Sequence, residues 1–223
     1  MKHKRNLLRN SAWACLLAAG LFACSGEKAS ESEAEESPAE TSALSRLEEE
    51  HLLEKVAYAD SVNAGLLEDT FKGSARREAT GTIGKSLITV NYGSPGVRGR
   101  TIWNGLVSYD QVWVSGSHWA TAVSFSAPVS INGKKVEPGM YGFFTVPGKE
   151  EWVLILNEAY DMHLAEEYFE GEDIIRLVVN PEILEEPVQR LTYEIETVSD
   201  TEGFLVLSWE KIRVRLPITG VNA

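Results

Sequence analysis

Two histidines could supply metal chemistry to the part of this chain that is patterned to fold. His118 lies in "SHWAT" and His163 in "DMHLA", 45 positions further on. Neutral imidazole is a common ligand for zinc, copper and iron, and a carboxylate such as Asp161 or Glu167 would complete a divalent metal site. The bound ion would act as a Lewis acid or activate a water. The separation matches no ligand-spacing motif. We therefore expect no metal, and a metal-binding protein or metal-dependent enzyme using His118 and His163 is the alternative.

The same segments are also suited to binding a ligand without catalysis. Binding pockets combine aromatic walls with a few polar groups that orient the ligand. The sequence contains no serine-hydrolase elbow, no "HExxH" zinc motif and no calcium loop, so it predicts no catalytic residue. The favoured function is a binding or structural module whose partner is a small molecule, a glycan or another protein, held at one end of the fold. The candidate contact residues are Arg100, Trp113, His118, Asp161 and His163.

Arg100 ends a glycine-rich stretch, "GSPGVRGR" (93–100), that follows a predicted strand. A phosphate-binding loop needs Gly-Lys-Ser or Gly-Lys-Thr leading into a helix, and neither feature follows here. The stretch is instead typical of a tight turn, because glycine adopts positive φ without steric cost. Arg100 would then either bind a ligand carboxylate or pair with an acidic side chain of the protein itself.

The first residues of the chain predict a location in the cell envelope. Four basic residues precede the short apolar run "SAWACLLAAGLFA" (11–23), which is the layout of a secretory signal peptide over residues 1–23. The run ends in "LFAC", which resembles a bacterial lipobox. Lipid on Cys24 would anchor the protein, since each buried methylene adds roughly 0.8 kcal/mol of membrane affinity. An ordinary signal peptide cleaved nearby is the alternative. Ser25 after the cysteine favours the outer membrane, on either its periplasmic or its outer face.

The charge of the chain argues against nucleic acid as a partner. The net charge is −12; residues 25–75 hold 13 acidic and four basic residues, and residues 76–223 hold 20 acidic and 13 basic residues. Such an acidic surface repels phosphate backbones, and no basic stripe interrupts it. Cys15 falls in the signal peptide and Cys24 would carry lipid, so the mature chain would have no disulfide. Its stability must come from its core.

Composition and periodicity divide the rest into three regions. Residues 24–42 are rich in Ser, Glu and Ala and almost free of large apolar residues, which predicts a disordered acidic tether. Residues 43–75 begin with apolar residues at helical spacing, which predicts an N-terminal helical segment. In residues 76–223, short strands and the turn signals Asn132-Gly133 and Pro138-Gly139 predict an all-β domain, an antiparallel β-sandwich or jelly roll. Residues 159–171 predict one short helix or ordered loop between strands.

Strand alternation predicts where several side chains point. In "WATAVSFS" (119–126), alternation places Trp119 on the same face as Val123 and Phe125, so His118 and Trp119 cannot both enter one core. If Trp119 packs inward, His118 faces outward or into a second cleft. The stretch is interpreted first as the start of a strand with a polar corner and second as the wall of a pocket. Two further strands are predicted at "GFLVLSWE" (203–210) and "KIRVRLPI" (211–218). Trp209 is expected in the core, where replacing it by alanine would be costly.

Three stretches in order resemble one bacterial family of secreted proteins and lipoproteins. They are "NYGSPGVRGRTIWNGLVSYDQVWVSGSHWAT", "INGKKVEPGMYGFFTVPGKEEWVLILN" and "LSWEKIRVRLPI". The family is domain of unknown function 2911 (DUF2911), and the resemblance covers roughly residues 70–218. Its motifs fall on Tyr92, Ser94, Pro95, Gly99 and Arg100, and on Gly133, Lys134, Gly139, Tyr141, Phe144, Pro147 and Gly148.

One departure from the family pattern lies in the segment that holds the first histidine. Where many members have "W-R-T-G-A-N-x-x-T", this chain has "WVSGSHWAT", with Val114 at the arginine position and His118 at the asparagine position. Any role that rests on that guanidinium is therefore absent. The resemblance implies fold and location but carries no assigned activity.

Overall fold

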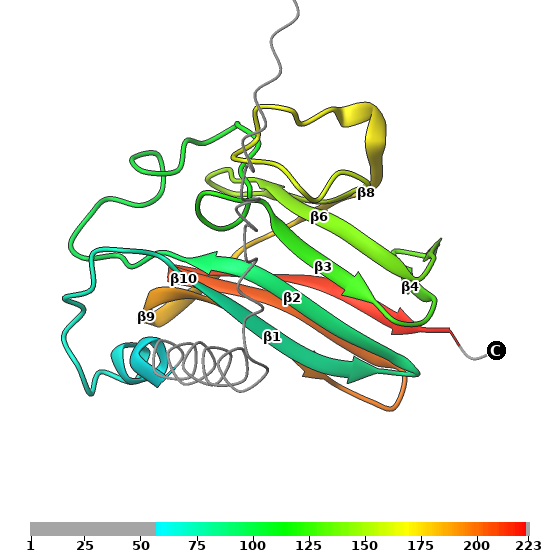
Figure 1. Ribbon diagram of the computed structural model, residues 1–223, viewed down its shortest axis with the longest axis horizontal. Coiled ribbons are helices and arrows are strands. Elements are labelled where there is room, and N and C mark those ends of the chain that lie inside the picture. The colour runs from blue at the N-terminus through cyan, green and yellow to red at the C-terminus, as the bar shows by residue number, and fades with distance from the viewer. Residues whose placement is uncertain (1–56, 222–223) are drawn as a thin grey trace, which may run out of the picture. The chain divides into compact units, whose positions relative to one another are not determined.

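The computed structural model describes residues 57–221, which form two antiparallel sheets packed face to face. This confirms the predicted all-β sandwich (Figure 1). The six-stranded sheet has the order β1 (Ala75–Ile83), β2 (Ser86–Ser94), β3 (Thr121–Phe125), β6 (Gly139–Val146), β7 (Trp152–Asn157) and β8 (Asp173–Val179). The four-stranded sheet has the order β5 (Lys134–Val136), β4 (Val129–Ile131), β10 (Glu202–Gly220) and β9 (Glu182–Thr197).

The core lies between the sheets and follows the period-two alternation of the strands. In β2, Ile88, Val90 and Tyr92 are buried against the second sheet, while Thr89 and Asn91 point to the outer face. Residues that alternate in this way bury one face of each strand. The turn signal Asn132-Gly133 forms a tight β4–β5 turn in which both residues have positive φ (50° and 77°). Such a turn suits the twist of a hairpin.

The two strands predicted over residues 203–218 are a single strand, β10. The register with β9 shifts on both sides of Glu210, which has a φ of 53°. A β-bulge inserts an extra residue and so changes which residues face inward. Leu207 and Trp209 reach the core before the bulge, and Val214 and Leu216 reach it afterwards. Because the inward-facing positions change at the bulge, the sequence pattern of this one strand resembles that of two.

Only the last part of the expected N-terminal helical segment falls among the described residues. Helix is present at residues 57–63, an irregular stretch follows, and β1 starts at Ala75. β1 gave little signal because its inward positions include Arg77 and the small Ala79. The predicted signal peptide, Cys24, the tether and residues 43–56 lie outside the described residues. Within residues 57–221, no helix combines the length and apolar character that crossing a membrane would need.

Four tryptophans meet at one end of the core. Trp209 is 1% exposed, as the alternation predicted. It lies edge-on to Trp103 at 5.7 Å and stacks on Trp113 at 5.9 Å, while Trp103 also contacts Trp152 edge-on at 4.9 Å. Edge-to-face and offset-stacked rings at such distances stabilise each other beyond their buried area.

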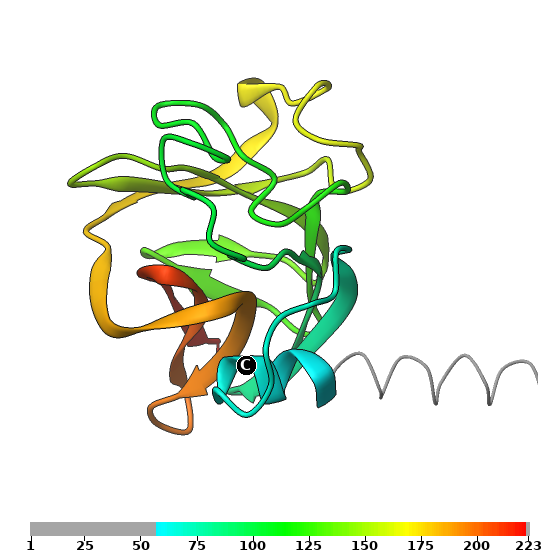
Figure 2. The same cartoon turned by 90° about the vertical axis from the view of Figure 1, so that its left-hand side faces the viewer.

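A second, smaller apolar cluster lies on the outer face of the six-stranded sheet. Phe144 of β6 and Ile155 of β7 point outward, and Val114, Ala120 and Met162 from two long loops cover them. Residues 159–169 are one of these loops, and the 3-10 helix η1 (Glu170–Glu172) follows it. Figure 2 shows the green and yellow loops together at the top of the view. They cover β6 and β7 and leave the outer face of β1, β2 and β3 open.

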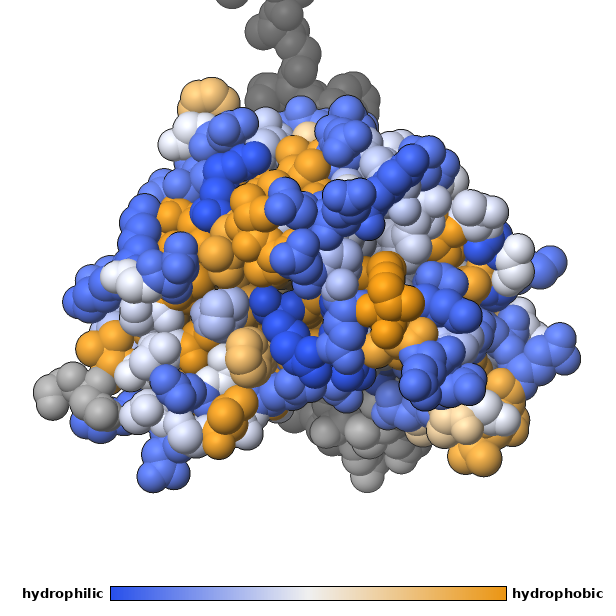
Figure 3. Space-filling view, turned by 180° about the vertical axis from the view of Figure 1, so that it is seen from behind, coloured by the Kyte–Doolittle hydropathy of each residue, from blue (hydrophilic) through white to orange (hydrophobic). Residues whose placement is uncertain are grey.

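The side of the molecule that faces away from the viewer in Figure 1 carries both apolar and hydrophilic side chains. Seen from behind, hydrophilic side chains border each apolar group, and the largest apolar group lies at the upper left of the view (Figure 3). Exposed apolar side chains of the β8–β9 region include Val178 and Ile183.

Candidate functional site

The segment from Val112 to Thr121 begins as a buried corner built around Ser115. Ser115 is fully buried with a φ of 54°, and its hydroxyl donates to Oγ1 of Thr145 at 3.0 Å. Its carbonyl accepts from the Tyr193 hydroxyl at 2.7 Å and from Oγ1 of Thr121 at 3.0 Å. Burial raises the pKa of Tyr193 well above its ordinary value, so this hydroxyl stays protonated and keeps donating. These bonds make the first half of the segment structural.

The second half of the segment projects from the fold, and the prediction that Trp119 shares the face of Val123 and Phe125 is wrong. Trp119 is 50% exposed, whereas the following Ala120 is buried. The alternation starts only at Thr121, where β3 begins, because His118 has a φ of 65° and breaks the extended chain. His118 is exposed, as expected. His118 and Trp119 thus form an exposed ridge.

The structure brings His163 to this ridge, but not as a metal ligand. The backbone N–H of Leu164 donates to the His118 carbonyl at 2.6 Å, and the His163 ring packs edge-on against Trp119 at 5.7 Å. Among residues 57–221, no group of three or more His, Cys, Asp or Glu side chains could hold a metal ion. The residues present therefore do not fit the alternative metal site.

A pocket of about 410 Å³ lies on one side of the ridge, beside the tryptophan cluster; we call it the end pocket. It brings together three of the predicted contact residues, Arg100, Trp113 and His118, and does not include the other two, Asp161 and His163. Its size falls in the range of roughly 300–1,000 Å³ that is usual for small-molecule sites. Sequence reasoning missed other lining residues, among them Lys72, Arg98, Leu106, Val107 and Trp209.

The end pocket concentrates positive charge. Lys72, Arg98 and Arg100 line it together with His118, and no acidic residue does. Burial, and then the like charge of Arg98, lower the pKa of Arg100 from its ordinary value. Arginine remains protonated at neutral pH even so. Lys72 is distant in sequence from Arg98 and Arg100, and the fold brings the three together. For this reason the sequence shows no basic stripe.

Arg100 forms no ion pair with an acidic side chain of the described residues. Its Nε donates to the Val97 carbonyl at 3.2 Å, and one Nη donates to the Gly96 carbonyl. Arg98 and Gly99 both have positive φ, and the Arg100 N–H bonds the Val97 carbonyl at 3.0 Å. The glycine-rich stretch is thus the predicted tight turn, and it holds the guanidinium at the pocket rim.

Several polar atoms around the end pocket are buried without a hydrogen-bond partner among the described residues. They are Nε of Arg98, Oγ of Ser117 and Nε1 of Trp209. Such groups are costly, and in folded proteins most are paired with protein, water or ligand. Two of the three are N–H donors, which can only bind an acceptor.

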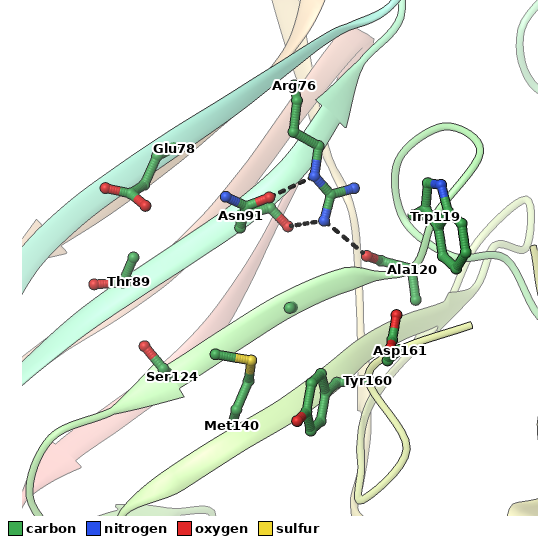
Figure 4. A pocket seen from close by; sticks show the side chains of 11 residues that line it. Arg76, Glu78, Thr89, Asn91, Trp119, Ala120, Ser124, Met140, Tyr160 and Asp161 are labelled. Carbon is green, nitrogen blue, oxygen red and sulfur yellow. Dashed lines mark hydrogen bonds between the residues drawn. The ribbon is translucent and has the colours of Figure 1, made fainter. Parts of the chain in front are cut away.

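A second cavity, of about 400 Å³, lies on the open face of the six-stranded sheet, on the other side of the ridge; we call it the sheet-face cavity. Figure 4 shows that Arg76 and Glu78 from β1 lie on one side and that Trp119, Tyr160 and Asp161 lie on the other. The floor is made of residues at alternate positions of β2 and β3: Thr89, Asn91, Ala122 and Ser124. Asp161, a predicted contact residue, is here rather than in the end pocket.

Comparison with known proteins identifies the family of this chain. A family model described as "Protein of unknown function (DUF2911)" matches residues 74–218. No curated protein and no solved structure matches the chain. The matched region starts at the edge of β1 and ends within β10, so it covers both sheets and both cavities apart from Lys72 and Gly73 of the end pocket.

Proposed function

The chain belongs to the DUF2911 family, and we propose that this member is a lipid-anchored envelope protein whose sandwich binds a small amphipathic anion, without catalysis, in the end pocket. One observation carries the proposal. Three cations and a histidine line an apolar pocket that no acidic residue lines, in a chain whose net charge is −12. A local reversal of charge in an acidic protein favours an anionic ligand.

The lining suggests how such a ligand would lie. Trp113, Trp209 and Val107 offer an apolar floor for an aromatic or aliphatic body. Arg98 and Arg100 lie where they would bind a carboxylate, sulfonate or phosphate head. Guanidinium groups suit these anions because their N–H donors match the paired oxygens.

A serine that lines the end pocket also agrees with a binding role. Ser117 lines the pocket, but its Oγ has no hydrogen-bond partner among the described residues. A serine nucleophile needs an adjacent base that takes its proton. Among the described residues Ser117 has none in hydrogen-bond contact, so it lacks the arrangement of a serine nucleophile.

Two fluorescent probes of similar shape test the end pocket. We expect 8-anilinonaphthalene-1-sulfonate to bind with one-to-one stoichiometry and more tightly than uncharged N-phenyl-1-naphthylamine. The double change Lys72→Gln and Arg100→Gln should weaken binding of the sulfonate by about tenfold or more, equivalent to about 1.4 kcal/mol, and leave the neutral probe unaffected. Lys85→Gln, at an exposed lysine outside the pocket, is the control. Equal affinity for both probes, or no effect of the double change, would contradict the proposal.

The lipid anchor has its own test. Replacing Cys24 by alanine removes the residue that would carry the acyl chains. We expect the variant to move from the membrane pellet to the soluble fraction when cells are fractionated, because acyl chains supply the membrane affinity. Retention of the alanine variant in the membrane would refute the anchor, and protease treatment of whole cells would show which face the wild-type protein occupies.

A further inference from the structure

We propose that the sheet-face cavity is a second, independent binding site and that it takes a neutral sugar ring of a glycan. The cavity shares the ridge with the end pocket, but its lining has a different chemistry. Trp119, Tyr160 and Met140 provide apolar surface, and hydroxyl, amide and charged groups of both signs provide hydrogen bonds. Pyranose rings have the same dual character, with apolar C–H faces and a rim of hydroxyl groups.

The aromatic side chains are positioned for a ligand and not for the core. Trp119 is 50% exposed and Tyr160 is 43% exposed, although the fold buries two of its other tryptophans almost completely. The His163 ring packs against Trp119 with the ring planes at 80° and helps to hold the indole in place, while half of the Trp119 side chain stays exposed. An aromatic ring fixed at the rim of a polar cavity is suited to stacking against the apolar face of a sugar.

The floor of the cavity supplies hydrogen bonds in a fixed array. Thr89 and Asn91 lie two residues apart on β2, and Ser124 on the neighbouring β3 pairs with Thr89 in the sheet. Hydroxyl and amide side chains both donate and accept hydrogen bonds. Sugar hydroxyls also do both, so this floor matches a ligand with many hydroxyl groups better than one with a single charged head.

The charges of the cavity oppose an anionic ligand. Arg76 donates through Nε to Oδ1 of Asn91 and through Nη2 to the carbonyls of Asn91 at 3.3 Å and Ala120 at 3.4 Å. Its guanidinium is thus held in place, and Nη1 makes no hydrogen bond within residues 57–221 (Figure 4). The carboxylates of Glu78 and Asp161 outnumber this one cation. A neutral ligand that can donate to the carboxylates and accept from Nη1 fits this arrangement best.

The test uses defined oligosaccharides and isothermal titration calorimetry on the folded protein. The neutral probes are cellohexaose, maltohexaose, laminarihexaose and chitohexaose, and hexagalacturonate is the anionic probe. We expect at least one neutral probe to bind and the anionic probe not to. Trp119→Ala should weaken that binding about 30-fold or more, which is the loss typical when an aromatic hot spot is truncated.

Two control variants test whether the glycan binds in this cavity and not elsewhere on the protein. Leu87→Ala removes an exposed apolar side chain from the same face of β2, outside the cavity, and should leave glycan affinity unchanged. The Lys72→Gln and Arg100→Gln variant should also bind the glycan normally, so failure of the end-pocket proposal would leave this one standing. Binding of none of the four neutral probes, or undiminished binding by a folded Trp119→Ala protein, would overturn the proposal.

Discussion

Replacing Arg190 by alanine is expected to lower the free energy of unfolding by about 3–5 kcal/mol, because it strands a buried charge. Arg190 lies on β9 and is 1% exposed. Its Nη2 donates to Oδ1 of Asp69 at 2.6 Å, and the Asp69 side chain is only 8% exposed. Without Arg190, Asp69 would remain buried without its ion-pair partner.

The same side chain holds the irregular segment before β1 against the sandwich. Arg190 donates to the backbone carbonyls of Phe71 at 2.7 Å, Gly73 at 3.2 Å and Ser94 at 3.1 Å. Its guanidinium also lies over the rings of Phe71 and Tyr58, at 5.1 and 5.5 Å from their centroids. One residue therefore ties residues 58–73 to β2 and β9. We expect this segment to lose protection from amide hydrogen exchange in the Arg190→Ala protein.

Urea denaturation followed by tryptophan fluorescence measures the loss of stability. Lys135→Ala is the control, because it breaks an exposed ion pair. The side chains of Lys135 and Glu137 are 57% and 63% exposed, and losing their pair should lower the free energy of unfolding by less than about 1 kcal/mol. In a double-mutant cycle, Asp69→Asn should recover part of the loss in the Arg190→Ala background, since it removes the stranded charge. A loss below about 1 kcal/mol for Arg190→Ala, the range of an exposed pair, would mean that the pair is not essential to the fold.

The sandwich could be predicted because alternation and turn residues mark most of its strands in the local sequence. Prediction failed where contacts between residues distant in sequence decide the structure. Alternation identified β3 and the second half of β10, and Asn-Gly identified the β4–β5 turn. β1 was missed because an arginine occupies one of its inward positions. Arg77 is buried and forms an ion pair at 2.6 Å with Asp60 of the preceding helix, a contact that periodicity does not reveal.

The candidate sites were predictable only in part, for the same reason. The segment from Val112 to Thr121 was singled out from the sequence, and Arg100, Trp113 and His118 line one pocket. Alternation failed at Trp119 because positive φ at Ser115 and His118 redirects the chain before β3 begins. The sheet-face cavity exists because the loops cover β6 and β7 and stop short of β3. That boundary depends on tertiary packing, so no sequence pattern marks it.

Both proposed sites depend on one short piece of chain. Ser115 is held by Thr145 and Tyr193, so the corner that precedes the ridge is rigid. From it the chain places His118 in the end pocket and Trp119 in the sheet-face cavity. If both sites bind ligands as proposed, the break in strand alternation at His118 has a function, because it directs two adjacent side chains into two different cavities.

Replacing Trp209 by alanine is expected to cost about 3–5 kcal/mol of unfolding free energy, the usual loss for a fully buried aromatic residue. Trp209 is 1% exposed and contacts the rings of Trp103 and Trp113, so its removal leaves a cavity lined by two tryptophans that lose a stacking partner.

Two variants show whether the loss measured for Trp209 comes from packing. Trp209→Phe should cost clearly less than alanine, because a ring remains and the indole Nε1 has no hydrogen-bond partner among the described residues to lose. Trp119→Ala, at a 50% exposed tryptophan, should change stability by about 0.5 kcal/mol or less. Thermal and urea unfolding of the three variants give the comparison. Equal losses at Trp209 and Trp119 would contradict the assignment of Trp209 to the core and Trp119 to a ligand site, since burial is what distinguishes the two positions.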